Sequence, residues 1–182
     1  MPAPVLVTFL AGDEGPWRIE AIEPYRGESL ARATRLDIAS GHVVAPARAR
    51  WSLRGSTSNA RYVERRERRT LDALQAPLGR PEASRASLIP VRKSAEWWEL
   101  TQEERRAIFE ERSHHIEASL PFLPAIARRL HHCRELGEPF DFLTWFEYAP
   151  GDAGRFDELL MLLRATEEWR YVERETHVRL AR

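Results

Sequence analysis

The chain has 182 residues, of which 43% are apolar and 31% charged, a composition that fits a soluble globular protein and excludes a disordered chain, a collagen and a disulfide scaffold. The 28 basic and 28 acidic residues cancel, so net charge does not favour binding to nucleic acid or to an anionic membrane. Cys133 is the only cysteine, no apolar run reaches the ~18 residues that span a bilayer, and the N-terminus has no secretory pattern. We therefore expect a cytoplasmic protein.

The first half of the sequence contains three predicted strands and two predicted helices. Alternating apolar and polar residues indicate strands, whereas apolar residues three and four apart indicate helices. The strands cover residues 5–10, 17–21 and 47–53, and the helices cover a weakly helical stretch at 26–39 and residues 59–75 behind the capping Ser58. Pro77, Gly79 and Pro81 break the second helix, so we divide one compact unit into two halves, 1–80 and 81–182.

The second half has a clearer order of elements. The predicted elements are a strand at 87–91, a helix from a capping box at Thr101 and Glu104 to about Ala118, a hairpin at 126–133 and 140–148, a helix behind Asp152 with Phe156, Leu159, Leu160 and Leu163 on one face, and a strand at 169–180. This order is the ferredoxin-like split βαβ pattern, of which the first half resembles an abbreviated copy. Residues 126–133 also fit a helix, but the matched arms and the aromatic second arm favour a hairpin.

The histidines include two adjacent pairs, at 114–115 and 131–132, whose spacing does not suit a zinc site on a helix. In a continuous helix, steps of about 100° per residue place His115 at the edge of the apolar face and His114 on the opposite side. We therefore expect His115 to face the interior and His114 to face water. The alternative is an ordinary half-buried His115 that hydrogen-bonds to a neighbour.

Arg128 lies in the first arm of the predicted hairpin. Alternation places it on one face with Ile126 and Leu130, and the second arm brings Thr144 to the same side. If that face turns inward, the guanidinium enters an apolar cavity, where an unpaired cation is costly. Such an arginine suits a bound anion, and the alternative is a rim residue that pairs with a glutamate.

Lys93 is the only lysine among the 28 basic residues, and Trp97 and Trp98 follow it closely. A compact ammonium and two indole N–H groups can hold carboxylates while the rings pack on a flat ligand. Core packing is the alternative for the two tryptophans. The arginines between 61 and 69 alternate with Glu64 and Glu67, which indicates a solvated helix face and no nucleic-acid site.

Five segments, in this order and spacing, resemble the chlorite dismutase family, most closely its short, dimeric class without a signal sequence. They are residues 93–98 (KSAEWW), 113–115 (SHH), 123–130 (LPAIARRL), 142–147 (FLTWFE) and 165–169 (ATEEW). The resemblance covers most of 58–182 well and the first 57 residues loosely. Together with the order of elements it implies an α+β fold, in which ferredoxin-like repeats form an antiparallel β-barrel with helices outside and an abbreviated first half.

The resemblance also implies a haem b enzyme that converts chlorite to chloride and dioxygen. His115 matches the proximal ligand of the haem iron, and Arg128 matches a distal arginine that retains hypochlorite for formation of the O–O bond. Glu168 matches the carboxylate that hydrogen-bonds the proximal histidine. The other expected site residues are Lys93 on the proximal side, Gln75 holding the distal arginine, Asn59 and Tyr62 at the propionates, Trp97 and Trp98 in the haem pocket, and Leu130, Thr144 and Phe146 in the distal wall.

Other functions stay open at this point. Coproheme decarboxylases of the same superfamily carry a different residue where Arg128 stands, and a haem carrier or sensor has no need of a buried cation facing the iron. A peroxidase-like haem protein without physiological chlorite activity and a haem-free ferredoxin-like dimer are further alternatives. For the favoured enzyme we expect a homodimer that binds chlorite and neither nucleic acid nor membrane.

Overall fold

The computed structural model describes residues 4–41, 43–57 and 62–182. Its strands are β1 (Leu6–Gly12), β2 (Trp17–Arg26), β3 (Arg35–Ser40), β4 (Trp51–Thr57), β5 (Arg85–Lys93), β6 (Ala127–His132), β7 (Phe142–Tyr148) and β8 (Val172–Ala181). Its helices are α1 (Arg65–Leu74), α2 (Ala95–Glu99), α3 (Gln102–Arg106), α4 (His115–Ser119) and α5 (Ala153–Arg164). A π-helical turn covers Ala107–Arg112, and 3₁₀ turns cover Leu120–Phe122, Arg134–Leu136, Pro150–Asp152 and Glu168–Tyr171.

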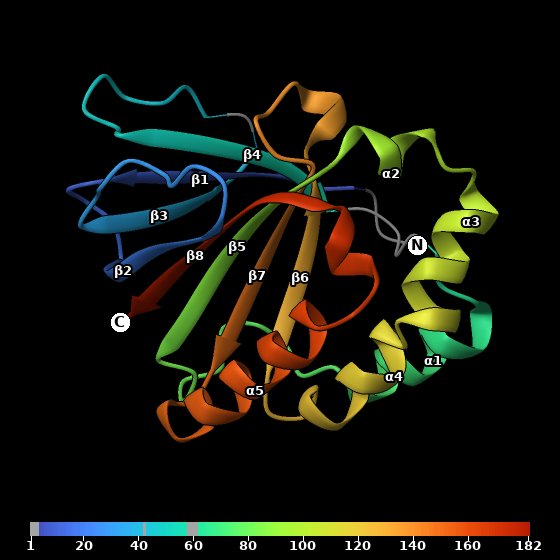
Figure 1. The fold of residues 1–182 in the computed structure, drawn as a ribbon. Coiled ribbons are helices and arrows are strands. Elements are labelled where there is room, and N and C mark those ends of the chain that lie inside the picture. The colour runs from blue at the N-terminus through green and yellow to red at the C-terminus, as the bar shows by residue number, and fades with distance from the viewer. Residues whose placement is uncertain (1–3, 42, 58–61) are drawn as a thin grey trace.

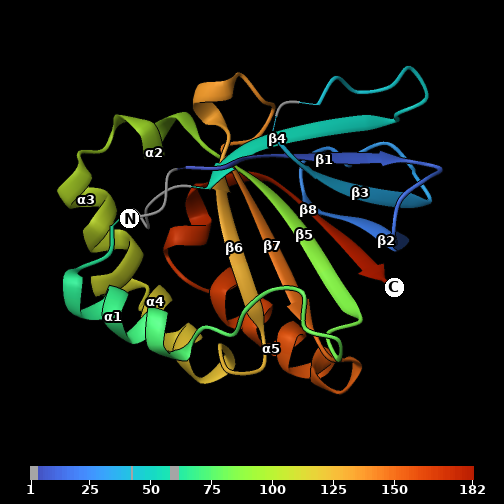
Figure 2. The same ribbon diagram turned by 180° about the vertical axis from the view of Figure 1, so that it is seen from behind.

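The strands close into one antiparallel barrel (Figure 1). Neighbours follow the order β1-β3-β2-β8-β5-β7-β6-β4, and pairing of β4 with β1 completes the ring. Helices α2 to α5 gather on the outside, on the side of β5 to β8, as the views from both sides show (Figures 1 and 2). The predicted α+β fold, an antiparallel barrel with external helices, is therefore confirmed, while the division of the chain near residue 80 stays a prediction.

The first half departs from the sequence prediction at three places. The helix at 26–39 is wrong, because this stretch ends β2, forms a loop and enters β3, which pairs with the distant β1 along its length. The strand predicted at 47–53 starts at Trp51 and runs to Thr57. The helix predicted at 59–75 starts at Arg65 in the structure, and its proposed cap Ser58 lies outside the described residues.

The second half has the predicted order of strands and helices. Residues 127–132 form a strand, so the helical alternative is wrong here. β6 and β7 make the expected hairpin, in which Arg128 lies opposite Phe146 and Leu130 lies opposite Thr144. Side chains alternate along both strands, so these four share one face of the hairpin.

The helix predicted from Thr101 to about Ala118 is not continuous. Thr101 caps α3 as expected, but α3 passes into the π-helical turn, and the chain breaks at His114, which has a φ of 50°. The last strand begins later than predicted, because Glu168–Tyr171 forms a 3₁₀ turn before β8. Asp152 occupies the N-cap of α5, but its side chain makes no capping hydrogen bond.

Two apolar clusters lie on opposite faces of the hairpin. One fills the barrel interior and includes Phe9, Leu53 and Trp145 from different strands. The other packs the outer face against the predicted apolar side of α5, on which Phe156, Leu159, Leu160 and Leu163 are all buried. No helix in the described ranges has the length and apolar character needed to cross a membrane.

Candidate functional site

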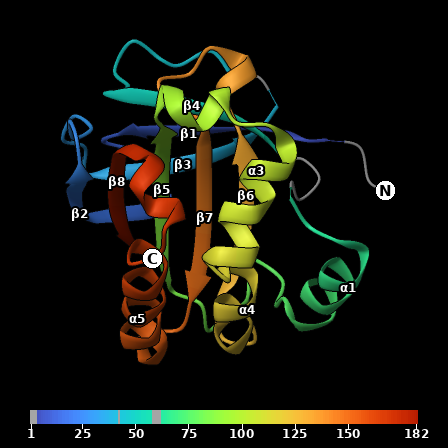
Figure 3. The ribbon, with the colours of Figure 1, turned by 45° about the vertical axis from the view of Figure 1, so that its right-hand side comes forward.

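A cavity of about 130 Å³, partly open to solvent, is lined by residues of β5 to β7 and of α4 and α5. Figure 3 shows these two helices in front of the three strands. The apolar lining consists of Ile89, Val91, Trp97, Phe109, Leu123, Ile126, Leu130, Phe142, Phe146, Leu159, Leu160, Leu163 and Trp169. The polar lining consists of Tyr62, Lys93, Ser119, His115, Arg128, His132, Thr144 and Glu168.

The backbone break before α4 aims His115 into this cavity. His114 takes the left-handed conformation, and His115 becomes the first residue of a new helix. Glu110, on the π-helical turn, caps that helix, since its carboxylate accepts the N–H groups of Ile116 at 2.6 Å and Glu117 at 3.2 Å. The His115 side chain is 17% exposed and that of His114 61%. The predicted directions of both rings are confirmed, although the continuous helix from which they were predicted does not exist.

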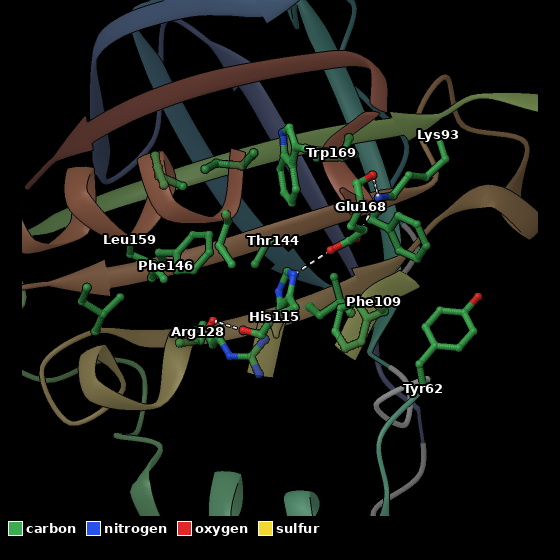
Figure 4. Close-up of a pocket in the computed structure, with 18 of the residues that line it drawn as sticks. Tyr62, Lys93, Phe109, His115, Arg128, Thr144, Phe146, Leu159, Glu168 and Trp169 are labelled. Carbon is green, nitrogen blue, oxygen red and sulfur yellow. Dashed lines mark hydrogen bonds and ion pairs between the residues drawn. The ribbon is translucent and has the colours of Figure 1, made fainter. Parts of the chain in front are cut away.

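His115 belongs to a buried three-residue network (Figure 4). Its Nδ1 donates to Glu168 Oε2 at 2.7 Å, and Lys93 Nζ donates to Glu168 Oε1 at 2.7 Å. Burial alone raises the pKa of Glu168, but Lys93 and His115 outweigh it and lower that pKa to about 2. Ser113 fixes the main chain of the carboxylate, because its Oγ accepts the Glu168 N–H at 3.0 Å. The network leaves His115 Nε2 without a hydrogen-bond partner among the residues described.

Arg128 reaches the same cavity from β6 (Figure 4). Its guanidinium makes no ion pair within the described ranges, and its buried Nε has no hydrogen-bond partner there. Burial lowers its pKa, yet an arginine stays protonated in proteins, so the positive charge persists. The alternative of a rim arginine paired with a glutamate is therefore wrong. Gln75 does hold this residue, but through the main chain, since Gln75 Nε2 donates to the Arg128 carbonyl at 2.8 Å.

The other predicted site residues fall into three groups. Those that line the cavity are Tyr62, Trp97, Leu130, Thr144 and Phe146. Trp98 does not line it; its indole donates to Asp141 at 3.3 Å and its ring stacks on Phe142. Asn59 lies outside the residues that the structure describes.

Two aromatic residues beside His115 were not assigned a role from the sequence. The Phe109 ring stacks on His115 with centroids 4.4 Å apart, and the Trp169 ring lies 6.4 Å away with planes 22° apart. Phe109 falls on the apolar face of the predicted helix, at whose edge His115 lies, so the helical pattern carried a signal for its burial. Trp169 was placed in a strand, and the 3₁₀ turn that directs its ring has no local sequence signature.

Comparisons with known proteins agree on one family. A sequence model of the family described as chlorite dismutase matches residues 28–182. A chlorite dismutase from Ideonella dechloratans is 40% identical over 86 residues, which are 47% of this chain but only 28% of the length of that protein.

Solved structures extend the likeness to nearly the whole chain. The crystal structure of dimeric chlorite dismutases from Nitrobacter winogradskyi has 61% sequence identity and a TM-score of 0.90, covering 97% of this chain and 99% of that one. A mutant chlorite dismutase from Candidatus Nitrospira defluvii in complex with cyanide has 20% identity and a TM-score of 0.67 over 98% and 90% of the two chains, a likeness of fold. The match of the family model to most of the sequence shows that this chain belongs to the chlorite dismutase family.

Proposed function

We propose that the protein is a haem b enzyme that decomposes chlorite to chloride and dioxygen. The observation that carries this proposal is the cavity in which a free imidazole nitrogen of His115 and the unpartnered guanidinium of Arg128 occur together. An iron porphyrin needs the first and a small anion needs the second. Membership of the chlorite dismutase family supports the same activity.

The residues present fit a haem. The cavity walls are largely apolar and aromatic, and His115 Nε2 would be the iron ligand because Nδ1 is engaged by Glu168. Trp97 and Tyr62 pack edge to face, with ring centroids 6.1 Å apart, and would border the porphyrin, with Tyr62 at its propionates. When bound, the haem would supply the redox-active iron at which chlorite is decomposed.

The Glu168 carboxylate has the task of fixing the imidazole. By accepting the Nδ1 proton it selects the tautomer in which Nε2 carries the lone pair, and its negative charge makes that nitrogen more basic. Lys93 holds the carboxylate from the other side. A pKa of about 2 keeps Glu168 ionised throughout the physiological range, so the imidazole keeps its acceptor.

Arg128 has the task of binding the anions. Its charge cannot be removed by deprotonation, and its N–H groups are available because no acidic side chain among the described residues neutralises them. We infer that it draws in chlorite and retains hypochlorite until the O–O bond forms. The wall of Leu130, Thr144 and Phe146 shields this step from water. Gln75 would steady Arg128 through its carbonyl.

A haem carrier, a sensor or a peroxidase-like protein without physiological chlorite activity is the competing function. A carrier gains nothing from an uncompensated cation beside its haem, because such a charge is costly to bury. Arg128 therefore favours the enzyme. We further propose that the protein is a homodimer, as the Nitrobacter winogradskyi protein is described, and the cytoplasmic location stays a prediction.

The experiment that tests this function combines haem titration with an oxygen electrode. We expect the haem-loaded protein to release dioxygen from chlorite. Arg128→Ala should keep the haem spectrum, lose most of the dioxygen yield and release hypochlorite that chlorinates an added probe. Arg129→Ala, at the exposed next position of β6, is the matched control and should behave as wild type. Equal yields from both variants would remove the role of Arg128, and a wild-type protein that binds no haem would refute the whole proposal.

A further inference from the structure

The His115 imidazole has a second set of contacts besides Glu168. Its ring lies between two aromatic planes, Phe109 at 4.4 Å with a 25° interplanar angle and Trp169 at 6.4 Å with 22° (Figure 4). A single hydrogen bond at Nδ1 fixes one edge of a ring but leaves rotation about the bond direction. Nearly parallel neighbours restrict that rotation, because turning the imidazole would drive it into their faces.

Trp169 is itself anchored from behind. Its Nε1 donates to Glu175 Oε2 at 2.7 Å, and the other oxygen of that carboxylate accepts two bonds from Arg164, at 2.9 and 2.5 Å. Glu175 lies on β8 and is 0% exposed, while Arg164 ends α5. The Trp169 indole, which follows Glu168 directly in the chain, is thus tied through Glu175 to both β8 and α5.

Stability alone does not explain the buried Glu175–Arg164 pair that anchors Trp169. A buried ion pair contributes little net stability, and well-packed apolar residues often replace one without loss. The pair holds the Nε1 edge of Trp169, whose side chain lines the cavity, and Lys93 Nζ lies 5.4 Å from the centroid of the same ring. The charges therefore converge on the orientation of one indole beside the candidate iron ligand.

We propose that Trp169, held by the Glu175–Arg164 pair, is a positioning residue that fixes the plane of the His115 imidazole. Glu168 sets the tautomer and the direction of Nε2, and Trp169 sets the rotation of the ring. The consequence for haem ligation rests on the function proposed above; the orientation of the imidazole does not.

The chain offers a matched control. Trp145 Nε1 donates to Glu147 Oε1 at 2.9 Å, which is also a buried indole–carboxylate bond, but Trp145 belongs to the cluster inside the barrel and does not line the cavity. Loss of either bond leaves a buried carboxylate oxygen unsatisfied. Trp145→Phe therefore reports the cost of losing such a bond without any change beside His115.

The first measurement uses the haem-free protein. We compare the ring signals of His115, assigned by His115→Ala, in NMR spectra of wild type, Trp169→Leu and Trp145→Phe. Trp169→Leu should broaden these signals because the ring becomes mobile, beyond the shift that loss of the indole ring current causes by itself, and Trp145→Phe should leave them unchanged. Trp169→Phe retains a ring but loses the N–H, so it should give a smaller effect and serves if the leucine variant does not fold. His115 line widths that are the same in all variants would overturn the positioning role, whether or not the protein binds haem.

The second measurement uses haem-loaded protein. Loss of haem to excess apomyoglobin should be about tenfold faster in Trp169→Leu, a size typical for residues that orient a metal ligand, and the iron–histidine stretching band should shift or broaden. Trp145→Phe should change neither, even if it lowers the melting temperature as much. Haem loss that follows melting temperature alone in both variants would overturn the proposal. Failure of the wild type to bind haem would refute the proposed function and leave the NMR result to decide on the orientation.

Discussion

The two faces of the β6–β7 hairpin treat a buried basic side chain in opposite ways. On the interior face, His131 is 2% exposed, packs against Phe9 with centroids 5.3 Å apart, and its Nδ1 hydrogen-bonds to the Leu143 carbonyl at 3.0 Å. On the cavity face, Arg128 has a buried Nε without a partner. The same period-two alternation thus supplies one satisfied polar group and one unsatisfied cation.

The difference lies in whether each side chain can lose its proton when it is buried. Burial lowers the pKa of His131 to about 4, so this ring is neutral at physiological pH. The hydrogen bond that the neutral ring loses to water is replaced by the one to the Leu143 carbonyl. Burial also lowers the pKa of Arg128, but a guanidinium does not lose its proton. Its positive charge therefore stays uncompensated by the described residues of the cavity. The uncompensated charge of Arg128 on the cavity face therefore suits a bound anion, whereas the neutral, hydrogen-bonded His131 on the interior face suits a stable core.

The largest expected effect is the loss of haem binding when His115 is removed from the cavity. His115→Ala should abolish the histidine-ligated haem spectrum, because it removes the only imidazole that Glu168 holds in the described cavity. His114→Asn is the control, since asparagine tolerates the left-handed backbone of this exposed position. Absorbance titration with haem measures both, and equal binding by the two variants would contradict the assignment.

The next effect tests the support of that imidazole. Lys93→Met keeps the length of the side chain but removes the nearest cation, so the pKa of Glu168 should rise and haem should bind roughly 10–100-fold more weakly. Arg92→Met is the control at the neighbouring position, where the arginine pairs on the surface with Glu173. Competition with apomyoglobin measures the affinity. A Lys93→Met protein as tight as the control would show that Lys93 serves packing alone.

The two faces should also fail in different pH ranges. The folded-state pKa of His131 lies below its ordinary 6.5, so the unfolded chain takes up a proton first as pH falls from 6.5 to about 4. This site should therefore cost about 1.4 kcal/mol of unfolding free energy per pH unit in that range. The contribution of Glu168 is fully present above its ordinary 4.5 and is lost only as pH falls towards 2.

The unfolding free energy, measured with urea between pH 7 and 4.5, distinguishes the contributions of His131 and Glu168. His131→Gln should lose less stability than wild type over this interval, because the titrating ring is gone, whereas Glu168→Gln should keep the wild-type slope. A His131→Gln protein with the same slope as wild type would show that the interior histidine does not control acid stability. His177, whose pKa burial lowers to about 3, should add a slope of the same sign in both proteins.

Sequence periodicity predicted the cavity face better than it predicted the first half. Alternation placed Arg128 with Leu130 and Thr144, and the structure has all three in one wall, because a hairpin forms from local pairing and its face is set by a period of two. β3 was missed because it has little pattern of its own. Its residues are held by pairing with β1, more than twenty positions away, and only Leu36 is fully buried.

The direction of His115 was predicted from a helix that is interrupted in the structure. The ring reaches the cavity through a π-helical turn, a left-handed His114 and a cap from Glu110, none of which a steady rotation of about 100° per residue contains. Trp169 could not be assigned for a related reason: its role depends on Glu175 and Arg164, which reach it only in the folded chain. Local patterns fix which side of an element is buried, and tertiary contacts fix where a side chain on that side points.

The smallest expected effect tests the cap that starts α4 on the cavity side. Glu110→Ala removes the acceptor of two main-chain N–H groups, a loss of about 1 kcal/mol that should lower the melting temperature by roughly 2–4 °C. Glu111→Ala, at the exposed next position, should change it by less. Because the cap holds the first turn that carries His115, haem affinity should fall slightly in Glu110→Ala and stay constant in Glu111→Ala. A stability loss without any change in affinity would mean that the aromatic rings and Glu168 position the imidazole without help from the helix that bears it.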